Sequence, residues 1–191
     1  MRIILGTAQF GSTYGLVNNA GYLTDRQMSE IIDLAQANQI LMVDTAPRYG
    51  NAEERLGRTL CNDDWKIVTK LSKLEKSIPS SHLAKYVENE ICSSLERLGK
   101  SYIDTLLVHN SSDLCLPNGM ELYKCLRSLQ SQGLFNKLGV SVYTGNEIDN
   151  ILRDYKLDVV QLPVSILDQR LLASGHLQRL KEQDIEIHAR S

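Results

Sequence analysis

The chain has 191 residues, which is enough for one well-buried domain and short for two. Hydrophobic residues make up 42% of it and charged residues 23%, as in ordinary soluble globular proteins, and the formal net charge of −2 excludes a general electrostatic attraction to nucleic acids or anionic membranes. No apolar run approaches the ~18 residues that a membrane span needs, and the N-terminus MRIILGTAQFG lacks the features of a secretory signal, so we expect a cytoplasmic protein that binds neither nucleic acid nor membrane.

Short apolar segments alternate with amphipathic ones along the whole chain. The apolar segments are nearly continuous in Val, Ile and Leu, which is typical of parallel strands that are buried on both faces. They predict strands at Ile3–Leu5, Leu41–Val43, Ile67–Thr69, Ile103–Val108, Leu138–Val142, Val159–Leu162 and Ile185–Ile187.

Between the strand segments, apolar residues recur at helical spacing. Thr24 and Gln27 have the spacing of a capping box and mark the start of a first helix. The clearest helix begins at Ser80 or Ser81 and ends at Gly99, a residue type that commonly terminates helices. Further helices are predicted from about Met120 to Gly133 and over Glu53–Leu60, Glu147–Tyr155 and Leu171–Gln183.

This order of elements is typical of either a doubly wound parallel sheet or a (β/α)8 TIM-type barrel. The first turn, GTAQFGSTYG, lacks the GxGxxG pattern of a dinucleotide-binding doubly wound fold, which favours the barrel. A barrel needs eight strands and the pattern provides seven, so we expect one α/β barrel domain over residues 1–191 that is truncated at its C-terminal side and lacks the last βα units.

Four polar residues lie where predicted strands end, or in the turn that follows: Asp44, Tyr49, Lys70 and His109. Taken singly, each has an ordinary structural explanation, such as a turn-forming carboxylate or a lysine that reaches solvent. Taken together, they bring an acid, a phenol, an amine and an imidazole to one end of the sheet. This combination favours a proton-transfer site.

Lys70 is the key to this interpretation. An ammonium group that points into a barrel is unfavourable without a carboxylate, and Asp44 on the preceding strand is the natural partner. A phenol in water ionises near pH ~10, and a nearby cation favours its ionised form. Lys70 would therefore make the Tyr49 hydroxyl a better general acid at neutral pH.

The four cysteines are widely spaced and include no CxxC pair. We therefore expect reduced thiols, no disulfide framework and no metal site. The residues concerned are Cys61, Cys92, Cys115 and Cys125.

Several segments, taken in order, resemble the aldo/keto reductase family: LGTAQFG, DTAPRYGNAEERLG, IVTKL, SLERLGKSYIDTLLVHN, KLGVSVY and VVQLPVSILDQR. The resemblance covers essentially the whole chain, and the DTAPRYGNAEERLG segment is highly specific. It implies a (β/α)8 barrel and reduction of an aldehyde or ketone, or the reverse reaction, with NADP(H) as cofactor and NAD(H) as the alternative.

The family's catalytic tetrad falls on Asp44, Tyr49, Lys70 and His109. By resemblance, hydride passes from the nicotinamide to the carbonyl carbon while Tyr49 protonates the carbonyl oxygen. Lys70, anchored by Asp44, tunes Tyr49, and His109 donates a hydrogen bond that orients the carbonyl group.

The resemblance also implies a set of cofactor-binding residues. Ser141 and Gln161 match the positions that hold the nicotinamide carboxamide, although the Asn that usually follows the serine is replaced by Val142. The terminal segment HARS aligns with a region that faces the nicotinamide ring, so Arg190 and Ser191 are expected there too. Arg190 stands where many members of the family have a tyrosine.

The family's site for the cofactor pyrophosphate and 2′-phosphate would lie beyond Ser191. Two functional hypotheses therefore remain open: an active reductase of a small carbonyl compound, such as a sugar-related aldehyde, and a non-catalytic interaction protein that retains the fold. Seven strands would leave two free sheet edges, so we also expect self-association through those edges.

Overall fold

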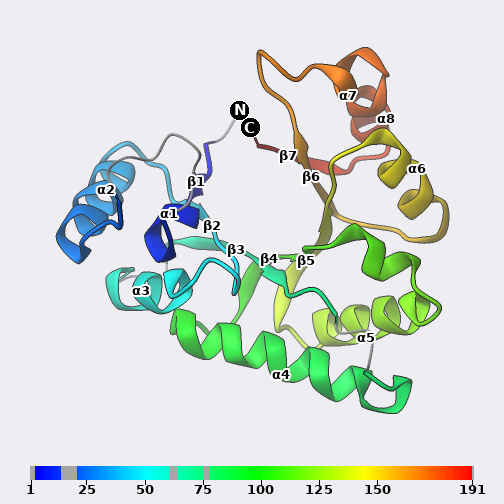
Figure 1. Ribbon diagram of the computed structural model, residues 1–191, viewed down its shortest axis with the longest axis horizontal. Helices are drawn as coiled ribbons and strands as arrows, with labels where there is room; N and C mark the ends of the chain where they lie inside the picture. Colours follow the sequence, from blue (N-terminus) through cyan, green and yellow to red (C-terminus); the bar gives the residue numbers. More distant parts are fainter. Residues whose placement is uncertain (1–2, 14–20, 61–63, 75–77, 191) are drawn as a thin grey trace.

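Seven parallel strands form one sheet in the computed structural model, which describes residues 3–13, 21–60, 64–74 and 78–190. The strands follow one another in chain order, and each pairs with the next one along the chain. Figure 1 shows the sheet curled into an incomplete barrel with helices around its outside, which confirms the predicted barrel-type α/β architecture. The strands are β1 (Leu5–Gly6), β2 (Met42–Asp44), β3 (Lys66–Leu71), β4 (Ile103–Val108), β5 (Phe135–Ser141), β6 (Val159–Pro163) and β7 (Glu186–Arg190).

The helices cover the outer face of the sheet, and most begin or end where the sequence predicts. Thr24 accepts a hydrogen bond from the Gln27 backbone and forms the expected capping box, and Gly99 ends the longest helix in a left-handed conformation. The helices are α1 (Ala8–Gly11), α2 (Asp25–Ala37), α3 (Ala52–Thr59), α4 (Ser80–Leu98), η1 (Ser111–Cys115), α5 (Gly119–Ser131), α6 (Gly145–Asp154), α7 (Arg170–Ala173) and α8 (His176–Glu182).

Several predicted elements differ in their bounds from the observed ones, including the strands predicted at Leu138–Val142 and Ile185–Ile187. Two further differences show the physical reason. The segment Leu171–Gln183 is not one helix, because Gly175 adopts a φ of 78° and separates α7 from α8. The first strand is Leu5–Gly6 and not Ile3–Leu5, because only Leu5 and Gly6 pair with β2. Both differences depend on backbone conformation or strand register, which the apolar pattern does not encode.

Alternation along each strand divides the sheet into two faces. Outward side chains such as Leu71, Leu106 and Val140 pack in the main core against α4 and α5. Inward side chains form a smaller cluster of Val68, Leu107 and Val159. On the same strand faces, two residues nearer the carboxyl ends, are three polar residues: Lys70, His109 and Gln161. The inner apolar cluster therefore lies directly below these polar side chains.

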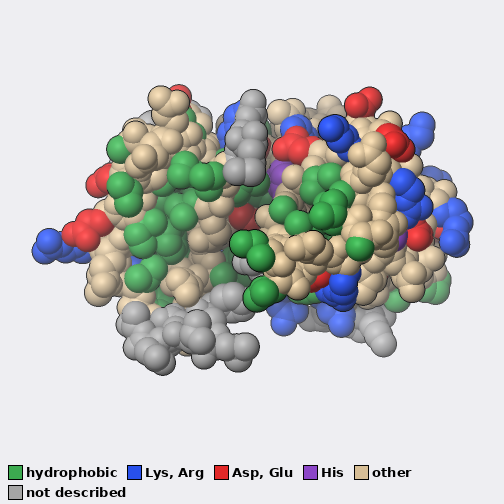
Figure 2. All heavy atoms as spheres, turned by 90° about the horizontal axis from the view of Figure 1, so that it is seen from above, with side chains coloured by type: hydrophobic (Ala, Val, Ile, Leu, Met, Phe, Trp, Pro, Cys, Tyr) green, Lys and Arg blue, Asp and Glu red, His purple; other side chains and the backbone are tan. Residues whose placement is uncertain are grey.

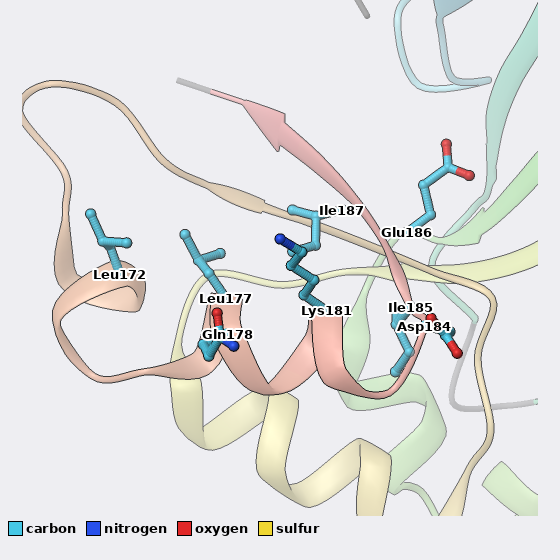
Figure 3. Close-up of a pocket in the computed structure, with 8 residues that line it drawn as sticks. All are labelled: Leu172, Leu177, Gln178, Lys181, Asp184, Ile185, Glu186 and Ile187. Atoms are coloured by element: carbon cyan, nitrogen blue, oxygen red, sulfur yellow. The ribbon is translucent and has the colours of Figure 1, made fainter. Parts of the chain in front are cut away.

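The described sheet ends at β1 on one side and at β7 on the other, and no described strand pairs with the outer side of either strand. Figure 2 shows hydrophobic side chains on both sides of the hollow between the two halves of the molecule. Two apolar side chains in the loop after β6 are strongly exposed, with Leu167 at 97% and Ile166 at 90%. A shallow cavity of about 510 Å³ lies along the outer face of β7 between Ile187 and the side chains of Leu172 and Leu177 (Figure 3).

Further features of the described residues concern cysteines, long apolar helices and metal-ligand clusters. Cys92, Cys115 and Cys125 are free cysteines, whereas Cys61 lies outside the described residues. Within the described ranges, no helix combines the length and apolar character needed to cross a membrane. No group of three or more His, Cys, Asp or Glu side chains in those ranges is arranged to hold a metal ion.

Candidate active site

The inward side chains near the carboxyl ends of the strands converge on one cavity of about 610 Å³. This cavity brings together seven of the eight residues that the sequence predicts for the site. They are Asp44, Tyr49, Lys70, His109, Ser141, Gln161 and Arg190. The eighth, Ser191, lies outside the described residues.

Lys70 is the most deeply buried charged group in this cavity. Its side chain is 2% exposed, and its Nζ lies 2.5 Å from Asp44 Oδ1 and 2.8 Å from the backbone oxygen of Thr45. Burial lowers the pKa of Lys70, and the adjacent Asp44 carboxylate acts in the opposite direction. Lys70 is thus a fixed cation whose proton is held less firmly than that of an exposed lysine.

Tyr49 is placed by the turn that follows β2. Its backbone N–H donates to the Ala46 oxygen, and Gly50 turns the chain immediately afterwards with a φ of 60°. The Tyr49 ring centroid lies 4.9 Å from Lys70 Nζ. The phenol ring therefore lies beside the ammonium group that the sequence predicts to favour its ionised form.

His109 completes the group at the end of β4. Its ring meets the Tyr49 ring edge-on, with centroids 6.2 Å apart. Burial, supported by the positive charge of Lys70, lowers the pKa of His109 to about 4. His109 is therefore neutral at pH 7, and a neutral imidazole can donate a hydrogen bond from one ring nitrogen.

Gln161 links the two predicted parts of the site. Its Nε2 donates a hydrogen bond to Asp44 Oδ2, and its Oε1 accepts one from Ser141 Oγ at 3.3 Å. Both Gln161 and Ser141 are 4% exposed. The Asp44 carboxylate is thus held by Lys70 on one oxygen and by Gln161 on the other, a connection that spans 117 residues of sequence and that sequence reasoning missed.

Arg190 lies at the end of β7, on the same wall of the cavity. Its guanidinium group donates to the backbone oxygen of Val142 at 3.2 Å and lies 4.2 Å from the Tyr143 ring centroid. Tyr143 lines the cavity as well, and the sequence analysis did not single it out. Its position directly after the GVSV segment was the signal that could have identified it.

His188 is a second residue of this wall that the sequence analysis missed. It is 4% exposed, and its Nε2 lies 3.0 Å from Glu186 Oε1, while the other carboxylate oxygen of Glu186 pairs with Lys137. Its Nδ1 is buried and has no hydrogen-bond partner in the described structure. His188 lies two residues before Arg190 on the same strand face, so period-two spacing could have identified it.

Comparison with known proteins places the chain in a family. A model described as "Aldo/keto reductase family" matches residues 2–191. The D-arabinose 1-dehydrogenase of Saccharomyces cerevisiae is 28% identical over an alignment of 139 residues that covers 68% of this chain and 41% of that protein. The NADH-specific methylglyoxal reductase of Escherichia coli is 27% identical over 150 residues, covering 69% and 46% of the two chains.

Solved structures show the same fold. One described as an aldo-keto reductase from Pseudomonas aeruginosa superposes with a TM-score of 0.77 at 28% identity, over 97% of this chain and 71% of that one. The holo form of an aldo-keto reductase from Bacillus halodurans gives a TM-score of 0.78 at 22% identity, over 99% and 61%, and shows likeness of fold alone. The chain spans less than half the length of the two curated relatives that it matches.

Proposed function

The chain belongs to the aldo/keto reductase family, and from that premise we propose that it reduces the carbonyl group of a small aldehyde or ketone to an alcohol with a nicotinamide cofactor. One observation carries the proposal. A phenol, a buried lysine–carboxylate pair and a neutral imidazole face a single cavity. This arrangement suits proton delivery to one oxygen atom.

We assign the proton to the Tyr49 hydroxyl. The Lys70 ammonium, 4.9 Å from the ring centroid, stabilises the phenolate left after Tyr49 donates its proton. Asp44 holds Lys70 in place, and Gln161 holds Asp44. His109, neutral at pH 7, donates a hydrogen bond to the carbonyl oxygen and orients it towards Tyr49.

Ser141, Gln161 and Arg190 are the proposed cofactor-binding residues among those described. The buried Gln161 amide uses one donor towards Asp44 and one lone pair towards Ser141, so it retains one N–H and one lone pair. A carboxamide offers the complementary acceptor and donor, so these residues fit a nicotinamide. When bound, the reduced nicotinamide supplies a hydride to the carbonyl carbon.

The cofactor is proposed to be NADP(H), with NAD(H) as the alternative. NAD(H) is supported by the similarity to a relative named an NADH-specific methylglyoxal reductase. For the substrate we propose a small carbonyl compound related to a sugar, which is supported by the relative named D-arabinose 1-dehydrogenase.

Fluorescence titration of the chain with NADPH and with NADH, followed by assay with D-arabinose, methylglyoxal and 4-nitrobenzaldehyde, tests this proposal. We expect saturable binding of at least one cofactor and cofactor-dependent loss or gain of absorbance at 340 nm. A chain that binds neither cofactor and acts on none of these compounds would instead favour the non-catalytic interaction protein.

We further propose that the chain self-associates through the edges of its sheet and resides in the cytoplasm. The unpaired edges and the exposed Ile166 and Leu167 support the first proposal, and the free cysteines support the second. Sedimentation velocity measures the self-association. Fractionation of cells tests the location, and recovery of the chain outside the cytoplasmic fraction would contradict it.

A further inference from the structure

The charges that face the catalytic cavity do not balance. Lys70 is neutralised by Asp44, and the two form a buried ion pair. Arg190 also lines the cavity, but no carboxylate of the described residues lies within salt-bridge distance of its guanidinium group. Because arginine is always protonated, the wall near Arg190 carries an excess positive charge.

The Arg190 guanidinium group is held in place rather than free to turn towards solvent. It donates to the Val142 backbone oxygen and stacks over the Tyr143 ring, whose face attracts a cation without neutralising it. Arg190 is only partly exposed. Its charge therefore remains at the ends of β5, β6 and β7, where it acts across the cavity.

This charge acts on His109 as well. Arg190 and Arg48 both contribute to the lowered pKa of His109, after burial and Lys70. Asp44 is the named group that acts in the other direction, and it does not cancel the others. A further cation in this cavity is thus disfavoured, and the neutral state of His109 is an instance of this effect.

We propose that Arg190 makes the cavity discriminate between the two forms of the nicotinamide cofactor, favouring the reduced form and disfavouring the oxidised one. The inference rests on the proposed function, because a hydride can reach a carbonyl carbon beside Tyr49 only if the nicotinamide ring enters this cavity. The reduced ring is neutral and the oxidised ring carries one positive charge. The phosphates and the adenosine are the same in both forms, so their contributions cancel when the two affinities are compared.

The discrimination favours exchange of the spent cofactor for a reduced one, and it opposes hydride donation itself, because the ring gains a positive charge in that step. A cavity that repels the oxidised ring releases the spent cofactor more readily and retains the reduced form for the next substrate. Two unit charges about 6–8 Å apart in a medium of effective dielectric constant ~20 change an affinity by roughly thirty- to a hundredfold. Because Arg190 is partly exposed, solvent screening brings the expected effect to about tenfold.

Dissociation constants for NADPH and NADP⁺ test the proposal in four forms of the protein. These are the wild type, Arg190→Met, which removes the charge, Arg190→Lys, which keeps it, and Arg153→Met, which removes an exposed arginine outside the cavity. We expect the ratio of the NADP⁺ constant to the NADPH constant to fall about tenfold in Arg190→Met. The ratio should remain within about twofold of wild type in the other two variants.

The outcomes separate this inference from the proposed function. If both cofactor forms bind and the ratio is the same in wild type and Arg190→Met, the role of Arg190 is wrong and the proposed function stands. If neither form binds to the wild type, the proposed function fails and this inference fails with it. Should Arg190→Met not fold, the wild type decides: the ratio must fall as KCl is raised from 20 mM to 500 mM, and a constant ratio overturns the proposal.

Discussion

At the scale of single residues, the site depends on how burial and charge act on neighbouring groups. Lys70 is almost completely buried and is paired with the Asp44 carboxylate, whereas His109 in the same cavity is neutral. Both effects have one origin, because removal from water disfavours a charge that has no partner. The same physics underlies the proposed role of Tyr49 as the acid, since its ionised form would have a cation beside it.

The low pKa of His109 predicts how stability depends on pH. In the unfolded chain this histidine ionises near 6.5, and in the folded chain at about 4. As the pH falls below 6.5, the unfolded chain takes up a proton at this histidine that the folded chain does not. The free energy of unfolding therefore decreases, and the contribution of His109 to this decrease is complete at about pH 4. Allowing for solvent screening at this partly exposed site, the loss is about 1–2 kcal/mol.

Urea unfolding of wild type and His109→Asn at pH 7 and pH 4.5 measures this contribution. The variant should lose less stability between the two pH values than the wild type does. His82→Asn, at an exposed position on α4, is the control and should behave like the wild type. An equal loss in wild type and His109→Asn would contradict the account of His109.

The residues at strand ends could be predicted because parallel strands bring their carboxyl ends to one side of a sheet. Asp44, Lys70 and His109 therefore lie together in the structure, and the family resemblance added Ser141 and Gln161. The hydrogen bond from Gln161 to Asp44 could not be predicted, because it depends on how far the sheet curls.

At the scale of elements, glycines explain part of the family-like segments. Gly11 of α1 and Gly50 after Tyr49 pack against each other, and a Cβ on Gly11 would lie 1.6 Å from the Tyr49 backbone oxygen. The first turn and the loop that carries the Tyr49 phenol are therefore in direct contact. LGTAQFG and RYG are linked in space although they are about 40 residues apart in sequence.

Gly11→Ala should consequently destabilise the protein and displace Tyr49. Overpacking of this kind typically lowers the free energy of unfolding by about 1–3 kcal/mol, and here the clash is with backbone, which cannot turn aside. Gly6→Ala is the matched control, because a Cβ at Gly6 has no neighbour within 4 Å. Urea denaturation that gives equal stabilities for the two variants would show that the contact is unimportant.

The buried Glu53 explains another part of the DTAPRYGNAEERLG segment. Its carboxylate is 1% exposed and accepts hydrogen bonds from Thr69 of β3 and from Arg97 of α4. It thereby joins α3 to the strand that carries Lys70. The amphipathic pattern predicted this helix but not the role of its glutamate, because a buried charge pair leaves no mark in hydrophobic periodicity.

At the scale of the whole molecule, the described sheet ends in two unpaired edges with exposed apolar side chains nearby. Parallel strands are normally covered on both sides, and open edges promote association. The seven strands and their order follow from the apolar pattern and the alternation of elements. What covers the two edges does not follow from this pattern, because it depends on contacts with other surfaces, which the apolar pattern of the strands does not describe.

A second copy of the chain is the proposed cover for these edges. Sedimentation velocity should show a dimer or larger species whose fraction rises with concentration. Ile166→Asp combined with Leu167→Asp should shift the chain towards monomer, because both side chains are almost fully exposed. Leu34→Asp, an exposed apolar position on α2, is the control. A strictly monomeric wild type at all concentrations would sink the proposal.

Single-turnover transfer of deuterium tests the central claim most directly. The chain is mixed with NADPH that carries deuterium at its transferable position and with 4-nitrobenzaldehyde, and the alcohol is analysed by mass spectrometry. We predict one deuterium in the alcohol formed by the wild type. For Tyr49→Phe we predict a rate lower by about 10²–10⁴-fold at unchanged NADPH affinity. An alcohol without deuterium, or equal rates in the two proteins, would contradict the assignment of a hydride-accepting carbonyl beside the Tyr49 acid.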